Sequence, residues 1–280
     1  MCTYNWEEVN GSVQRVPQIE RAAVARLSPW ETVLRWCGVY GDLFFLRWAN
    51  IRNEWYFHVI LGPLFPLAML GFLKMTGAIR DPESALYVTA GNAVLALVLG
   101  PMQSIANDLA WGKQRNDLEY LATLPFSKLQ MILAFVSVSS IFTIPSMLFT
   151  IWVGKLWLGF PVHFSPMLLP IMILSALSMC GLGVFMGVYA RNGHHANMMN
   201  TIAMGIAMFL SPVLIPFENL PLPLQWTSRL LPPSYAADAF RTSLSGGDFL
   251  SLLPDCAVLM GFTFGLLYLA TKRLDWRVEK

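Results

Sequence analysis

Six long apolar stretches fill most of this 280-residue chain and restrict what it can fold into. About 20 apolar residues, at ~1.5 Å of rise each, span the ~30 Å hydrocarbon layer of a bilayer, and each stretch is long enough to do so. Because a backbone in lipid must satisfy its own hydrogen bonds, unalternating runs of this length predict helices and not barrel strands. We therefore expect an all-α integral membrane protein with six transmembrane helices. The predicted spans are about 55–75, 86–106, 129–153, 166–190, 196–217 and 252–270.

The composition is typical of a polytopic membrane protein. Hydrophobic residues make up 55% of the chain and charged residues 13%, and the mean hydropathy is +0.52. The four cysteines show neither metal-ligand nor redox spacing, so no metal site is predicted. No Asp, Glu, Lys, Arg or His lies in the middle of a predicted span. Pumps that run on ion gradients usually carry such groups there, so we expect the driving energy to enter elsewhere.

The basic residues predict the orientation. If the N-terminus is inside, only five of the 19 Lys and Arg residues fall in external segments, as the positive-inside tendency requires. The first fifty residues contain no apolar core and cleavage site of a signal peptide, so both termini are expected in the cytoplasm and the chain in the inner membrane. Residues 1–54 then form a cytoplasmic N-terminal segment, 55–272 the six-helix domain and 273–280 a cytoplasmic tail. The five external basic residues are Lys74, Arg80, Lys155, Arg229 and Arg241.

Residues 28–53 predict an amphipathic helix before the first span. Ser28 and Pro29 are typical of an N-cap and a first helical position, and a glutamate three residues after the cap completes a capping box. Aromatic residues then recur every three or four positions. We expect this interface helix to lie on the cytoplasmic membrane surface with its aromatic face in the headgroup region. The alternative, a soluble core helix, has no other soluble apolar material to pack against. Its marker residues are Glu31, Arg35, Phe44 and Trp48.

The loop between the second and third predicted spans carries charges at helical spacing. Lys113 with Asp117, and Arg115 with Glu119, are four positions apart, which favours a short surface helix. Pro125 is expected to end that helix. Taken alone, such a run of charges is usually a solvated face without further function.

The external stretch 211–251 is rich in proline yet apolar. Its prolines exclude one continuous helix, and we expect it to re-enter the outer leaflet or cap the bundle, with a short helix over 234–244 before the last span. Asp238 and Arg241 are spaced to pair, which either pins this helix or is a local salt bridge of no functional weight. The residues singled out here are Pro221, Pro232, Tyr235, Asp238 and Arg241.

Three segments together resemble a known family. They are the interface helix, the loop Gly112-Lys-Gln-Arg-Asn-Asp-Leu-Glu-Tyr-Leu-Ala-Thr-Leu-Pro125, and an external Leu-Pro221 followed by Leu231-Pro-Pro-Ser-Tyr-Ala-Ala-Asp-Ala-Phe-Arg241. Their order resembles the permease subunit of a type-2 ABC exporter, a family that exports drugs, lipo-oligosaccharides, O-antigens and teichoic acids. Asn116-Asp117 stands where Gly-Thr is common in the family, which weakens the loop motif. The resemblance covers the chain from about Ser28 onward.

The resemblance implies partners and docking residues. In the family the loop docks on a separate ATPase subunit, and a second contact would come from the turn between the fourth and fifth spans. The two adjacent histidines of that turn also suggest a metal or haem pair, but neighbours on a helix point ~100° apart and chelate poorly. The chain has no Gly-x-x-x-x-Gly-Lys-[Ser/Thr] motif, so ATP and Mg²⁺ are expected in the partner and no cofactor in this chain. The docking residues implied are Lys113, Arg115, Asp117, Glu119 and Pro125 in the loop, and Arg191, His194 and His195 in the turn.

The expected function is the membrane-spanning subunit of an ATP-driven exporter for an amphipathic or lipid-linked substrate. Two ATPase copies, a second and identical permease copy, and the bilayer are the expected partners, with no nucleic acid. A secondary carrier and an intramembrane enzyme remain as alternatives. The carrier class usually has ionisable groups buried in broken helices, and the enzyme class needs a nucleophile and a base at depth.

Overall fold

The structure, a computed structural model, describes residues 29–52, 56, 60, 62–77, 79–115, 117, 123, 126–161, 165–209 and 222–273. Every regular element in these ranges is helical, which confirms the predicted all-α class. The helices are α3 (Pro29–Arg52), α4 (Leu64–Met75), α5 (Pro82–Leu97), η2 (Val98–Met102), α6 (Gln103–Gln114), α8 (Lys128–Leu158), α9 (Leu168–Tyr189), α10 (Gly193–Phe209), α11 (Leu222–Ser228), α12 (Pro232–Leu244) and α13 (Phe249–Arg273).

Four helices in the described ranges are long and apolar enough to cross a membrane, compared with the six that we predicted. They correspond to the second, third, fourth and sixth predicted spans. The first predicted span contains α4, a helix of 12 residues, and the fifth overlaps α10, a helix of 17 residues that begins at Gly193. The rest of these two spans lies largely outside the described residues, so a six-span fold is not confirmed. The four candidate spans are Pro82–Gln114, Lys128–Leu158, Leu168–Tyr189 and Phe249–Arg273.

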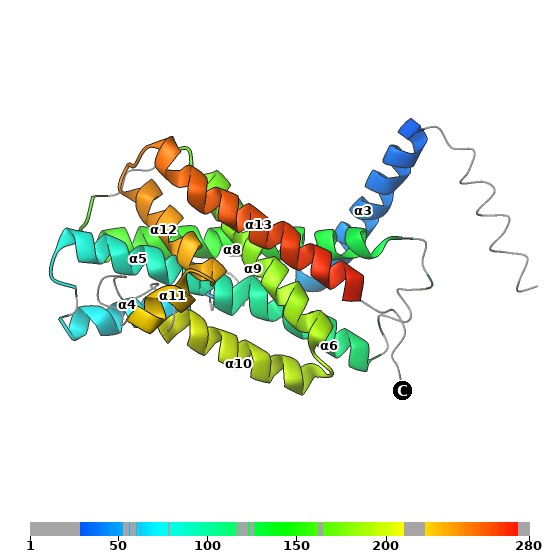
Figure 1. Cartoon of the computed structure of the whole chain (residues 1–280), viewed down its shortest axis with the longest axis horizontal. Coiled ribbons are helices and arrows are strands. Elements are labelled where there is room, and N and C mark those ends of the chain that lie inside the picture. Colours follow the sequence, from blue (N-terminus) through cyan, green and yellow to red (C-terminus); the bar gives the residue numbers. More distant parts are fainter. Residues whose placement is uncertain are drawn as a thin grey trace, which may run out of the picture.

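The long helices run side by side along the long axis of the molecule (Figure 1). We call the end where α6 and α9 finish and α8 and α10 begin the α6 end. The opposite end, where α5 begins and α12 lies, is the α12 end. α3 is inclined to the bundle and reaches it near the α6 end.

The Pro82–Gln114 span is one helix with a π turn in its middle. η2 has a wider turn than its neighbours α5 and α6, and Pro101 lies inside it. Proline has no N–H to donate to the preceding turn, so an α-helical ladder cannot continue unchanged through this position. Hydropathy alone predicted a span that ends at 106, and the helix extends beyond that residue. The helix continues to Gln114 because the polar residues of α6 find partners inside the protein, as described below.

α8 has the start and stop signals of a long helix. The Ser127 hydroxyl accepts a hydrogen bond from the Gln130 N–H at 3.2 Å, and the Ser127 N–H donates to Gln130 Oε1 at 2.8 Å. This reciprocal pair is a capping box. At the other end Gly159 adopts φ 71°, a left-handed conformation in which a side chain would be strained.

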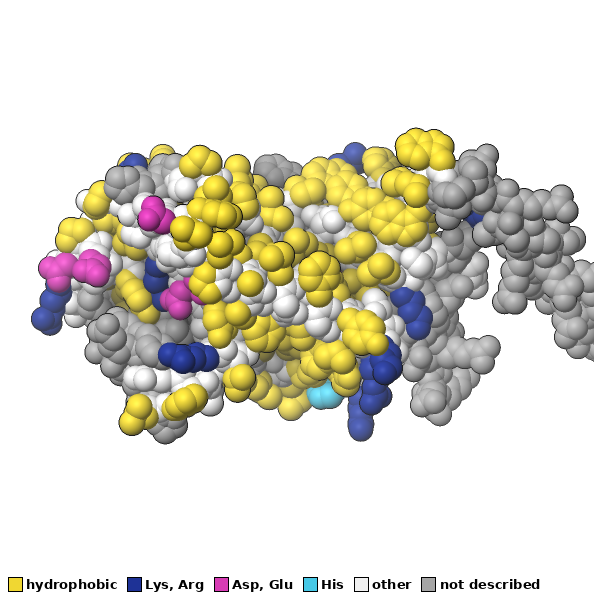
Figure 2. All heavy atoms as spheres, turned by 45° about the horizontal axis from the view of Figure 1, so that its top comes forward, with side chains coloured by type: hydrophobic (Ala, Val, Ile, Leu, Met, Phe, Trp, Pro, Cys, Tyr) yellow, Lys and Arg dark blue, Asp and Glu magenta, His cyan; other side chains and the backbone are white. Residues whose placement is uncertain are grey.

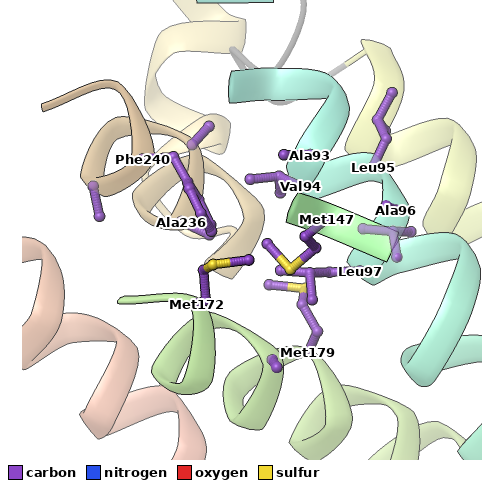
Figure 3. Close-up of a cluster of buried hydrophobic side chains, with 14 of the residues drawn as sticks. Ala93, Val94, Leu95, Ala96, Leu97, Met147, Met172, Met179, Ala236 and Phe240 are labelled. Atoms are coloured by element: carbon purple, nitrogen blue, oxygen red, sulfur yellow. The ribbon is translucent and has the colours of Figure 1, made fainter. Parts of the chain in front are cut away.

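α9 lies at the centre of the bundle and packs against α6, α8, α12 and α13. In the core that Figure 3 shows, Met147 of α8 and Met172 and Met179 of α9 meet Ala236 and Phe240 of α12, with α5 alongside. α12 was predicted over 234–244 and is observed over Pro232–Leu244. Because Phe240 is fully buried in this cluster, α12 is part of the packed bundle and not a loop over it. Its expected entry into the outer leaflet stays a prediction.

The surface has the distribution of side chains that a membrane requires. Figure 2 shows apolar side chains covering the middle of one face, with Lys, Arg and one His toward the α6 end and charges of both signs toward the α12 end. Large apolar side chains are also exposed on individual helices, for example Trp152 of α8 and Phe264 of α13. An apolar band between charged ends is the pattern of a membrane-embedded bundle.

Candidate functional site

The end of α6 and the turn between α9 and α10 meet at the α6 end. The Lys113 ammonium donates hydrogen bonds to three carbonyl oxygens at the C-terminus of α9, those of Gly187 at 3.0 Å, Ala190 at 3.2 Å and Val188. The last carbonyls of a helix lack partners within the helix and carry partial negative charge. Lys113 therefore caps α9 from a neighbouring helix, and its charge points into the bundle.

The expected pair between Lys113 and Asp117 is not present. α6 ends at Gln114, so Asp117 is not one helical turn beyond Lys113. Asp117 instead accepts a hydrogen bond from Arg115 Nε at 3.0 Å. Both side chains are more than half exposed, at 65% and 53%, so this pair lies on the surface of the α6 end. Glu119 and Pro125, the other predicted loop residues, lie outside the described residues.

The α9–α10 turn, predicted as a second contact, is held against α6. Asn192 is the N-cap of α10, because its Oδ1 accepts the His195 N–H at 2.7 Å. His195 Nδ1 in turn accepts the backbone N–H of Arg191 at 3.2 Å. The His194 ring lies edge-on to Trp111 of α6, with ring centroids 5.5 Å apart. The two histidines thus have different partners, and the turn and the α6 terminus form one surface.

α3 packs along the first half of α8, and this corrects its expected placement. Trp48 stacks on Phe142 of α8, with ring centroids 5.0 Å apart, and Phe44 stacks on Trp48. The Tyr40 hydroxyl donates to Ser137 of α8 at 2.8 Å. The expected headgroup contact is therefore wrong for Trp48, because its face of α3 contacts protein.

Other side chains of α3 face outward. Arg35 is exposed, and so are large apolar residues such as Trp30, Leu34 and Phe45. The side chain of Glu31 lies outside the described part of the structure. The outward apolar residues leave a membrane contact for α3 as a prediction, with a different face toward the lipid.

Sequence reasoning missed a partly buried ion pair between α3 and α6. Arg47 Nη2 donates to Asp108 Oδ2, and the Arg47 residue is only 9% exposed. Asp108 lies near the C-terminal end of the Pro82–Gln114 candidate span, beyond the predicted end at 106, so the expectation that the middle of each span lacks ionisable groups is not contradicted. One signal was available: Arg47 interrupts the aromatic face that Phe44 and Trp48 define. Asp108 gave no signal, because it fell just beyond the predicted end of the span.

A second polar contact lies beside this pair. The Asn200 side-chain amide of α10 donates to Asn107 Oδ1 of α6 at 3.0 Å, and Asn200 is buried. α6 therefore carries polar links to α3, α9 and α10 within its 12 residues. Hydrogen bonds inside an apolar bundle fix which residues face one another, because the groups have no water to bond instead.

The predicted residues of the external segment cluster at the α12 end. Arg241 donates to Asp238 at 2.7 Å, which confirms the pair, and its guanidinium carbon lies 3.3 Å from the ring centroid of Tyr87 on α5. Burial lowers the pKa of Arg241, while Tyr87 and Asp238 oppose that shift. The Tyr235 hydroxyl donates to the Arg229 carbonyl at 2.7 Å. Pro232 is buried at the start of α12, and Pro221 lies outside the described residues.

A bundle of apolar helices with charged ends defines a multi-pass membrane protein. A family model described as ABC-2 type transporter matches residues 43–244, which is most of the chain. The chain belongs to the ABC-2 type transporter family, and the predicted permease resemblance is confirmed. A comparison with curated proteins gave no match. The match includes the last part of α3 and runs to the end of α12, so it covers the contacts described above at the α6 end and at the α12 end.

Proposed function

We propose that this chain is the membrane-spanning subunit of an ATP-driven exporter, which works as a dimer with two separate ATPase subunits. The observation that carries the proposal is the meeting of two distant segments at the α6 end. The Gly193 N–H donates to Gln114 Oε1 at 3.5 Å across 79 positions of sequence, and the exposed Arg115–Asp117 pair lies next to this junction. A surface built from two segments is suited to docking a partner, and transporters of this family act with ATPase subunits.

In this proposal the α6 end faces the cytoplasm of the inner membrane and the α12 end faces outward. The basic residues at the α6 end support that orientation, because cytoplasmic ends carry an excess of Lys and Arg (Figure 2). α11 and α12 then form a cap at the exit of the pathway. The apolar surface of the bundle suits an amphipathic or lipid-linked substrate, which can reach the pathway from the bilayer.

Copurification tests the proposal. The chain, tagged and extracted in mild detergent, should bring down an ATPase that hydrolyses ATP, whereas the chain alone should not hydrolyse it. The double reversal Arg115→Glu with Glu119→Arg should reduce the ATPase recovered without changing the helical content. Arg80→Glu with Glu83→Arg, the equivalent double reversal at exposed positions of the opposite end, should leave recovery unchanged. Failure of the wild-type chain to bring down any ATPase would refute the exporter proposal, and normal recovery with the double reversal would refute the docking role of the loop.

The Arg47–Asp108 pair, of which Arg47 is buried, favours a second candidate, a secondary carrier, because carriers use ionisable groups within their helix bundles. Efflux of a fluorescent amphipathic dye from vesicles separates the two classes. Transport by the exporter requires ATP and continues when ion gradients are collapsed. Transport by a carrier continues without ATP and stops when the gradients are collapsed.

A further inference from the structure

The Arg47–Asp108 pair joins α3 to α6, two helices that are far apart in sequence. The residues are 61 positions apart, and α6 leads directly into the docking loop. We propose that Arg47 and Asp108 are positioning residues that hold α3 in register with α6, so that a movement of the α6 end on ATP binding is passed to α3. This inference rests on the proposed function.

The surroundings of the pair make it a strict constraint. The Arg47 side chain is 10% exposed and the Asp108 side chain 32%, and the Arg47 guanidinium carbon lies 4.8 Å from the ring centroid of Phe135 on α8. Asp108 also accepts a hydrogen bond from the Ser104 hydroxyl at 3.4 Å. A charge in such a setting is stable only while its partner stays in contact. α3 therefore cannot slide along α6 without leaving the Arg47 charge buried and unpaired.

The attachment of α3 to α8 is of a different kind. The Gln130 side-chain amide donates to the backbone carbonyl of Trp36 at 3.1 Å, and the Tyr40 hydroxyl donates to the Ser137 hydroxyl at 2.8 Å. Both hydrogen bonds are between neutral groups. These bonds and the ring contacts hold α3 on the bundle, so the ion pair is not needed to keep α3 attached. What the ion pair adds is a direct connection to the helix that ends at the docking surface.

An apolar contact between α3 and α6 would serve equally well for stability. Buried ion pairs often contribute no more to stability than well-packed apolar residues of similar volume, and their best-attested use is to fix register. α6 is fixed in the same way to α10 through Asn107 and to α9 through Lys113. The Arg47–Asp108 pair extends this set of specific links to α3.

Cys37 provides a reporter of α3 movement, since it is exposed on α3 whereas Cys180 is buried. In a background with Cys2, Cys180 and Cys256 replaced by alanine, an environment-sensitive fluorophore on Cys37 follows α3 alone. The complex with its copurified ATPase is placed in lipid nanodiscs, and ATP with Mg²⁺ is added. We expect the emission of the wild-type complex to change on ATP addition, and Arg47→Lys, which keeps the charge, to preserve that change.

The decisive variant is Arg47→Gln with Asp108→Asn, which removes both charges together and leaves neither buried without its partner. It should bind the ATPase and hydrolyse ATP as the wild type does but lose the Cys37 response. Arg52→Gln, the same replacement at an exposed position of α3, should keep the response. If the pair had only a structural role, the double variant, which still binds the ATPase, would keep the full Cys37 response. A full response in the double variant therefore overturns the proposal. Absence of a response in the wild type with the ATPase bound also overturns it.

Hydrogen exchange on the unsubstituted complex supplies a second measurement that does not depend on variants. On ATP addition, the amides of 36–48 and of 103–114 should change protection together. A change in 103–114 without one in 36–48 overturns the inference while leaving the proposed function intact. If no ATPase copurifies with the wild-type chain, the proposed function itself fails, and the inference fails with it.

Discussion

Replacement of Gly183 by alanine places a methyl group against the backbone of the π turn. A Cβ built on Gly183 would lie 2.4 Å from the carbonyl oxygen of Met102 and 3.0 Å and 3.1 Å from its Cα and carbonyl carbon. These are backbone atoms of η2, so no side-chain rotation relieves the contact. α9 must move away from η2, and overpacking of this kind costs about 1–3 kcal/mol of unfolding free energy. We expect a lower midpoint of thermal unfolding in detergent, followed by near-ultraviolet circular dichroism.

Two further glycines provide a graded control. A Cβ on Gly187 would lie 2.9 Å from the Ala106 carbonyl oxygen, so Gly187→Ala should destabilise less than Gly183→Ala. Gly205 of α10 has nothing within 4 Å of the added atom. Gly205→Ala should therefore be neutral or stabilise by about 0.5–1 kcal/mol, since alanine loses less conformational entropy in a helix. If Gly183→Ala unfolds at the wild-type temperature, the close packing of α9 on η2 is not as described.

Three other predictions concern Lys113, Arg241 and the packing of α12. Lys113→Gln removes the cation that caps α9 and should cost about 1–2 kcal/mol of unfolding free energy, measured by the same thermal assay; an unchanged midpoint would show that the carbonyl contacts are not formed. Arg241→Gln removes the contacts with Asp238 and Tyr87 and should cost about 1–2 kcal/mol; Arg241→Lys, tested beside it, should recover part of that loss. Protease added outside right-side-out vesicles should spare residues 232–244, because α12 is packed into the core, and rapid cleavage there would show a mobile loop.

The sequence predicted the helices better than it predicted their ends. Residues 166–190 were expected to form a span, and α9 is observed over Leu168–Tyr189, because a long apolar run without charged residues indicates a helix within the bundle. The Pro82–Gln114 span was predicted to end eight residues early. Hydropathy falls at Asn107 and Asp108, but the helix continues because these side chains bond to α10 and α3. A hydropathy profile cannot register a polar group whose partner is supplied by a distant segment.

The candidate site was predicted in its parts but not in its connections. Helical spacing suggested that Lys113 pairs with Asp117, but that rule holds only within one helix, and α6 ends at Gln114. The ammonium instead reaches the carbonyls of α9, about 75 positions away along the chain. Short-range patterns such as the Asp238–Arg241 spacing were confirmed because both residues lie on one helix, α12. Contacts between helices depend on the packing of the whole bundle, which no local pattern contains.

The two halves of the Pro82–Gln114 span share apolar packing but differ in their polar links, and this difference bears on how the protein can move. From Val88 on, α5 is buried and packs mainly through apolar contacts with α8 and α12, with the Arg241–Tyr87 contact near its start. α6 also buries apolar residues, and it is linked in addition by an ion pair, an amide hydrogen bond and a lysine cap. Apolar packing resists separation but tolerates small sliding, whereas paired charges and hydrogen bonds fix a register. η2 lies between the two halves, so the π turn separates the part of the helix that is tied to α3 and α10 by polar links from the part that lies in the core around α5.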